Sequence, residues 1–172
     1  PCSNINKFQE NNQHQRFLNN DEIRRLFKAA DDDENQYAGA YVKFLLLTGV
    51  RRSEGLAAKW EDMQSVSGRQ VWHIPHTKSG KSRNVILNPM ALEILESLPR
   101  IRGNPYVFPG KLEGQSIQNP IKAFKRIIKR AGIESSFRLH DIRHTVASLI
   151  INNGGTLYDV QATLAHANSK MS

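Results

Sequence analysis

The chain has 172 residues, of which 39% are hydrophobic, and this suffices for the core of one domain. Lysine and arginine outnumber aspartate and glutamate by 24 to 16, and the net charge of +8 favours a polyanionic partner, nucleic acid before an anionic membrane surface. A single cysteine, Cys2, excludes an internally disulfide-bonded secreted scaffold, and no apolar run approaches the roughly 18 residues of a membrane span. The N-terminus is polar and lacks a signal peptide's apolar core, so we expect a cytoplasmic protein.

The first half of the chain predicts a polar arm and three helices. Residues 1–18 are rich in Asn and Gln without periodicity, and predict a linker or arm. A helix over about 20–30 has acidic residues in its first turn and one apolar stripe. A second helix over 36–48 is apolar on nearly all sides, so we expect it to be buried, with Gly49 ending it. A short helix follows over about 52–58.

The remaining elements predict one hairpin and more helices. Two strand-like runs, 70–74 and 83–87, flank a polar, glycine-containing connector and predict an antiparallel hairpin. Four further helices are predicted, at about 89–98, 120–130, 141–152 and 157–165. The chain is therefore expected to have an α+β fold, mostly helical with a small antiparallel β-sheet.

The predicted helix over 120–130 has one basic face. Its apolar stripe leaves the opposite face to the cations Lys122, Lys125, Arg126 and Lys129. Such a face can be a solvated surface or a contact with nucleic-acid phosphates. The excess positive charge of the whole chain favours phosphate contact.

Two histidines, His140 and His144, are four residues apart on a predicted helix and resemble a zinc-binding pair. The zinc-protease motif needs a glutamate after its first histidine, and here Asp141 occupies that position. Arg143 would also repel a dication at close range. We therefore expect no metal and no cofactor. A metal-dependent hydrolase built on His140, His144 and His166 is the less favoured alternative.

Four segments, in this order, resemble the motifs of the tyrosine recombinases, also called phage-type integrases. They are TGVRRSEGL at 48–56, TKSGK at 77–81, HDIRHT at 140–145 and LAH at 164–166. Their order and separation agree with the family from about residue 19 to residue 172. The resemblance implies the fold of a tyrosine recombinase (DNA breaking-rejoining) catalytic core over 19–172, with 1–18 as the linker from an N-terminal core-binding domain.

Carried over position by position, the resemblance implies five catalytic residues: Arg51, Lys78, His140, Arg143 and His166. The two arginines would stabilise the charge that develops on a phosphodiester, because guanidinium is always charged and donates in a planar fork. Lys78 would protonate the leaving 5′-oxygen, with Lys81 as the alternative general acid, and Glu54 would orient the first arginine. His140 would accept the nucleophile's proton or donate to phosphate, and His166 would donate to a non-bridging oxygen.

Two positions depart from the family pattern. The family's nucleophilic tyrosine lies about nine residues after the position of His166, and the sequence ends at Ser172, six residues after it. The 172 residues are therefore expected to lack the nucleophile and to be inactive in cleavage. Ala165 stands where the family has glycine.

The function that the resemblance implies is site-specific recombination of a phage or mobile element. Its partner would be double-stranded DNA, bound by a homotetramer of the full-length protein in the bacterial cytoplasm, at the nucleoid. The reaction would proceed through a 3′-phosphotyrosine intermediate and religation. The alternative is a non-catalytic DNA-binding module that retains the recombinase fold.

Overall fold

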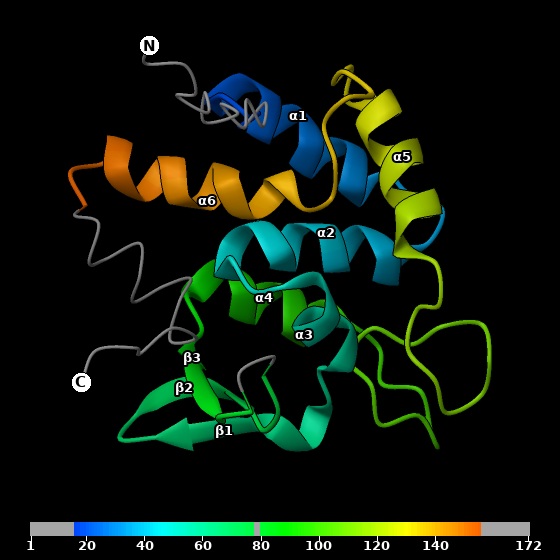
Figure 1. Ribbon diagram of the computed structural model, residues 1–172. Helices are drawn as coiled ribbons and strands as arrows, with labels where there is room; N and C mark the ends of the chain where they lie inside the picture. The colour runs from blue at the N-terminus through cyan, green and yellow to red at the C-terminus, as the bar shows by residue number, and fades with distance from the viewer. Residues whose placement is uncertain (1–15, 78–79, 156–172) are drawn as a thin grey trace, which may run out of the picture.

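The computed structural model describes residues 16–77 and 80–155 (Figure 1). Two expected catalytic residues, most of the predicted arm and the predicted helix at 157–165 lie outside this part; the two residues are Lys78 and His166. Within it the α+β fold expected from the sequence is confirmed, with six α-helices and one three-stranded antiparallel sheet. The elements are α1 (Asn20–Asp31), α2 (Gln36–Thr48), α3 (Arg52–Ala57), the 3-10 turn η1 (Trp60–Asp62), β1 (Met63–Val66), β2 (Arg69–Ile74), β3 (Arg83–Ile86), α4 (Pro89–Ser97), α5 (Pro120–Arg130) and α6 (Asp141–Asn152).

The ends of α1 and α2 follow from local capping residues. Asn19 and Glu22 form a reciprocal capping box at the start of α1. The side chain of Asn35 accepts hydrogen bonds from two backbone N–H groups at the start of α2. Gly49 ends α2 in the left-handed conformation with φ 64°, as its position in the sequence predicts.

Helix α2 is the central element of the core. Figure 1 shows it between α1 and α6 on one side and α3 and α4 on the other, and α2 packs against α1, α3, α4, α5 and α6. Tyr41 of α2 lies edge-on to Phe108, and Phe44 of α2 lies at a tilt to both Phe108 and Trp72 of β2, with ring centroids 5.4 Å apart in each pair. None of the described helices is long and apolar enough to cross a membrane.

The sheet has the strand order β1-β2-β3. The predicted hairpin of β2 and β3 is confirmed, with Ile74 opposite Arg83 at the base of its loop. Strand β1 was not predicted, because its residues are mostly exposed and show no apolar alternation. Its signal was the Ser67–Gly68 pair, in which both residues have positive φ, as a two-residue hairpin turn requires.

Candidate active site

Glu54 is the centre of the candidate site and is only 4% exposed. One carboxylate oxygen, Oε2, accepts the backbone N–H of Arg51 at 2.9 Å, and the other, Oε1, accepts Arg51 Nη1 at 3.1 Å. Arg83 Nη2 donates to Oε2 at 2.7 Å. Burial alone would raise the pKa of Glu54, but the hydrogen bonds from Arg51 and Arg83 and the charge of Arg83 hold it below its ordinary value. Glu54 is therefore an ionised carboxylate that fixes Arg51 at the start of α3.

Arg143, on α6, is the second guanidinium of the site. Its Nη1 donates to the carbonyl oxygen of Gly49 at 2.9 Å, directly after the end of α2. Burial, then the positive charges of Arg51 and Arg83, lower its pKa to about 10, while Glu54 acts in the opposite direction. Arg143 thus remains charged at neutral pH. Arg51, His140 and Arg143 line one small surface pocket, so a segment after α2 and the start of α6 meet there.

The start of α6 is held by Asp141, which is 1% exposed. Its carboxylate accepts the backbone N–H of Arg138 at 2.8 Å and forms an ion pair with the Arg138 guanidinium. Burial raises the pKa of Asp141, and the bonds from Arg138 outweigh this and lower it. Thr145 Oγ1 donates to the carbonyl oxygen of Asp141 and accepts the backbone N–H of Leu18. This buried network fixes the start of α6, which has His140 at its N-cap and Arg143 in its first turn.

The histidine pair predicted on this helix is present. His140 is exposed at the N-terminus of α6, and its ring lies edge-on to that of His144, with centroids 5.4 Å apart. Within residues 16–77 and 80–155 no three His, Cys, Asp or Glu side chains are grouped so as to hold a metal ion. His166, the third member of the alternative metal site, lies outside the described residues.

The loop between β2 and β3 carries both lysines considered for the general acid. Thr77 Oγ1 donates to the carbonyl oxygen of Lys81 at 2.7 Å, and the N–H of Gly80 donates to the carbonyl of Thr77 at 2.9 Å. Lys81 is exposed, and Lys78 is outside the described residues. The choice between Lys78 and Lys81 therefore stays a prediction.

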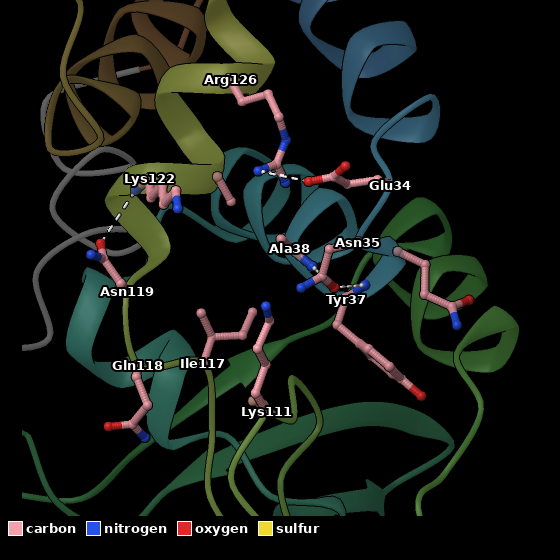
Figure 2. A pocket seen from close by; sticks show the side chains of 13 residues that line it. Glu34, Asn35, Tyr37, Ala38, Lys111, Ile117, Gln118, Asn119, Lys122 and Arg126 are labelled. Atoms are coloured by element: carbon pink, nitrogen blue, oxygen red, sulfur yellow. Dashed lines mark hydrogen bonds and ion pairs between the residues drawn. The ribbon is translucent and has the colours of Figure 1, made fainter.

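The basic face of α5 is divided between two roles. Lys122, Lys125 and Lys129 are exposed, as a phosphate-contacting face requires. Arg126 instead donates to both carboxylate oxygens of the buried Asp33, at 2.8 and 2.7 Å, and pairs with Glu34 at 3.1 Å, the contact drawn in Figure 2. Burial raises the pKa of Asp33, but the bonds from Arg126 lower it below its ordinary value. This guanidinium ties α5 to the loop before α2, and the expected contact of Arg126 with DNA stays a prediction.

Figure 2 shows the pocket next to this ion pair, between the first turns of α2 and α5. Lys111 and Lys122 line it together with Tyr37 and the helix-capping residues Asn35 and Asn119. It lies at the opposite end of α2 from Gly49, about 20 Å away for a helix of this length. It is therefore separate from the pocket that contains Arg51.

Arg83 was missed by the sequence analysis. It is only 7% exposed, and its ion pair with Glu54 spans 29 residues of sequence. In the sequence it is one charged residue at the start of a predicted strand, where solvent exposure is the ordinary expectation. A positively charged residue at an inward-facing strand position was the only available signal.

The family model of the phage integrases matches residues 16–172. The chain belongs to the phage integrase family. It is 27% identical to the integrase of Haemophilus phage HP1 over 177 residues, which cover 99% of this chain and 46% of that protein. It thus spans about half the length of the curated relatives it matches.

Solved structures confirm the expected catalytic-core fold. The catalytic domain of bacteriophage HP1 integrase has a TM-score of 0.65 at 27% identity, over 88% of this chain and 81% of that one. The XerH site-specific recombinase bound to difH substrate, a pre-cleavage complex, has a TM-score of 0.71 at 27% identity, over 88% of this chain and 47% of that one. The integrase-family chain described here therefore has the fold of a tyrosine recombinase catalytic domain.

Proposed function

We propose that this chain is the catalytic domain of a recombinase that cuts and rejoins double-stranded DNA at specific sites of a phage or mobile element. The observation that carries the proposal is the convergence of Arg51 and Arg143, with His140, on one pocket. Both guanidiniums are fixed before any substrate arrives, Arg51 by Glu54 and Arg143 by the Gly49 carbonyl. Preorganised donors of this kind stabilise charge that develops in a transition state.

The proposed reaction needs no metal, because cationic side chains neutralise the phosphate. A tyrosine hydroxyl attacks the phosphorus, the bond to the 5′-oxygen breaks, and a 3′-phosphotyrosine forms. The departing 5′-oxygen takes a proton from Lys78, or from Lys81 as the alternative. Arg51 and Arg143 bind the non-bridging oxygens, and losing one such donor typically slows the chemical step about 10²- to 10³-fold. Attack by a 5′-hydroxyl of a second strand reverses the sequence and rejoins the DNA.

The histidines have supporting roles in this proposal. His140, exposed at the start of α6, either accepts the tyrosine proton or donates to the phosphate. His166 donates to a non-bridging oxygen. The nucleophilic tyrosine, from the family pattern, would lie about nine residues after the position of His166.

The proposed partner is duplex DNA, and its supports are the net charge of +8 and the exposed Lys122, Lys125 and Lys129. The similar XerH recombinase was solved with its difH substrate. We further propose that 1–18 link this domain to a core-binding domain, and that the full-length protein acts as a homotetramer on DNA in the bacterial cytoplasm.

A suicide DNA substrate tests the proposal. The full-length protein is mixed with its attachment site carrying a nick that releases the cleaved strand. We expect a covalent protein–DNA adduct, in which mass spectrometry locates a phosphotyrosine. DNA binding without any adduct would refute the proposed reaction and favour a non-catalytic binding module.

A further inference from the structure

Arg83 is a buried cation beside the candidate site that the mechanism above does not use. It is the first residue of β3, lies opposite Ile74 at the base of the hairpin loop, and donates from Nη2 to Glu54 Oε2 at 2.7 Å. The same carboxylate accepts Arg51 Nη1 at 3.1 Å through its other oxygen. A single carboxylate thus connects the arginine at the start of α3 to the strand that follows the loop lysines.

We propose that Arg83 is a positioning residue, which acts through Glu54 to hold Arg51 in place and to anchor the lysine-bearing hairpin against α3. Its side chain is buried, so it contacts Glu54 and not the substrate. This role rests on the proposed function, because the position of Arg51 matters to the reaction only if Arg51 binds the DNA phosphate.

The hydrogen bonds to Glu54 show how the positioning works. Oε2 is occupied by Arg83 Nη2 and by the backbone N–H of Arg51, which directs Oε1 toward the Arg51 guanidinium. Removing Arg83 would leave Oε2 with the backbone N–H and would leave a buried carboxylate less compensated. The Glu54 carboxylate would then rotate more freely and take up a proton more readily, and Arg51 would lose its fixed acceptor.

The placement of Arg83 on β3 extends this effect to the loop. Lys81 lies two residues before it, and the loop begins directly after Ile74 on the opposite strand. The Glu54–Arg83 pair therefore fixes the base of the loop relative to Arg51. The proton donor on the loop and Arg51 at the N-cap of α3 have to contact the same phosphodiester. A fixed distance between the base of the loop and the start of α3 therefore favours the reaction.

A purely structural role explains this residue less well. Replacing a buried ion pair by apolar side chains is often neutral or even stabilising. The Nε of Arg83 is buried and has no hydrogen-bond partner among the described residues, which adds to the cost of keeping a cation there. Together with Arg51 and Arg143, Arg83 leaves the surroundings of Glu54 positively charged, which suits an anionic phosphodiester.

The test uses Arg83→Met, which removes the charge, and Arg83→Lys, which keeps it. The first measurement is the titration of the Glu54 carboxyl by NMR in the 172-residue chain without DNA. The charged groups that face Glu54 are Arg51 at the N-cap of α3, Arg83 on β3 and Arg143 on α6. We expect the Glu54 pKa to rise in Arg83→Met and to stay close to the wild-type value in Arg83→Lys.

The second measurement is single-turnover cleavage of the suicide substrate by the full-length protein across pH. Arg83→Met should slow cleavage about 10- to 100-fold, the range typical for groups that orient catalytic ligands, with DNA affinity nearly unchanged. The acidic limb of the pH–rate profile of Arg83→Met should move to higher pH, and Arg83→Lys should restore most of the cleavage rate. Arg69→Met, which changes an exposed cation at the start of β2, is the matched control and should behave as wild type.

The outcomes separate the two proposals. Wild-type rates and an unchanged Glu54 titration in Arg83→Met would overturn the positioning role, as would Arg83→Lys being as damaging as Arg83→Met. If Arg83→Met does not fold, Arg83→Lys and the uncharged Arg83→Gln decide the matter by the same two measurements. A wild-type protein that never cleaves would refute the proposed function, and the NMR titration would still decide whether Arg83 controls Glu54.

Discussion

The ionisation of Glu54, in the candidate site, makes the stability of the fold depend on pH. Its pKa in the folded chain is below its ordinary value of 4.5, so it binds a proton less readily when folded than when unfolded. Its contribution to stability is therefore fully present above the unfolded pKa and is lost as the pH falls through the folded pKa. The contribution is present at neutral pH and disappears in acid.

Glu54→Gln should lower the free energy of unfolding at pH 7 by about 3 kcal/mol, because it leaves the buried Arg83 without its counter-ion. In urea unfolding, the difference from wild type should narrow as the pH falls through the lowered pKa of Glu54, where the wild-type carboxyl becomes neutral as well. Glu61→Gln, at an exposed position, should change stability by less than about 0.5 kcal/mol. A difference that stays constant with pH would contradict this account of Glu54.

The residues of the site were predictable only where a short segment carries them. Arg51 with Glu54, and His140 with Arg143, lie within a few residues of each other, so family motifs locate them. Arg83 reaches Glu54 across 29 residues and Arg126 reaches Asp33 across 93, and each pair depends on how helices and strands pack. No local pattern distinguishes such a cation from a solvated one.

At the scale of elements, the helices of the described part were predictable because their ends depend on neighbouring residues. Capping by Asn19 and Asn35 and the positive φ of Gly49 are local properties. Strand β1 was missed because its stability comes from pairing with β2 and not from an apolar face. The hairpin of β2 and β3 was predictable because Trp72, Ile74 and Val85 lie on one buried face.

Helix α5 supplies a prediction that separates structural from DNA-binding cations. Arg126→Ala should destabilise the fold by about 2 kcal/mol, because it removes both guanidinium hydrogen bonds from the buried Asp33 and leaves only its longer ion pair with Arg130, at 3.7 Å. Lys129→Ala, one turn further along, should leave stability within about 0.5 kcal/mol and should weaken DNA binding. Thermal unfolding and fluorescence anisotropy with duplex DNA measure the two effects. The reverse pattern, with Arg126→Ala affecting only DNA binding, would contradict the assignment.

For the molecule as a whole, the net charge of +8 predicts DNA binding that depends strongly on salt. The proposal gives five phosphate-contacting cations in the described part: Arg51, Arg143, Lys122, Lys125 and Lys129. A plot of log affinity against log salt should then have a slope of about −4.5 for B-DNA. Lys125→Ala should reduce the steepness by about one unit. Affinity that is independent of salt would exclude phosphate-dominated binding.

We propose that Arg51, fixed by Glu54, stabilises the transition state at a DNA phosphate. The most direct measurement is the single-turnover rate of adduct formation by full-length Arg51→Ala on a suicide substrate at saturating DNA. We expect a rate about 10²- to 10³-fold below wild type, because Arg51 no longer stabilises the developing charge. Arg102→Ala, an exposed cation after α4, should cleave at the wild-type rate. An Arg51→Ala protein that folds, binds DNA and forms the adduct as fast as wild type would contradict the claim.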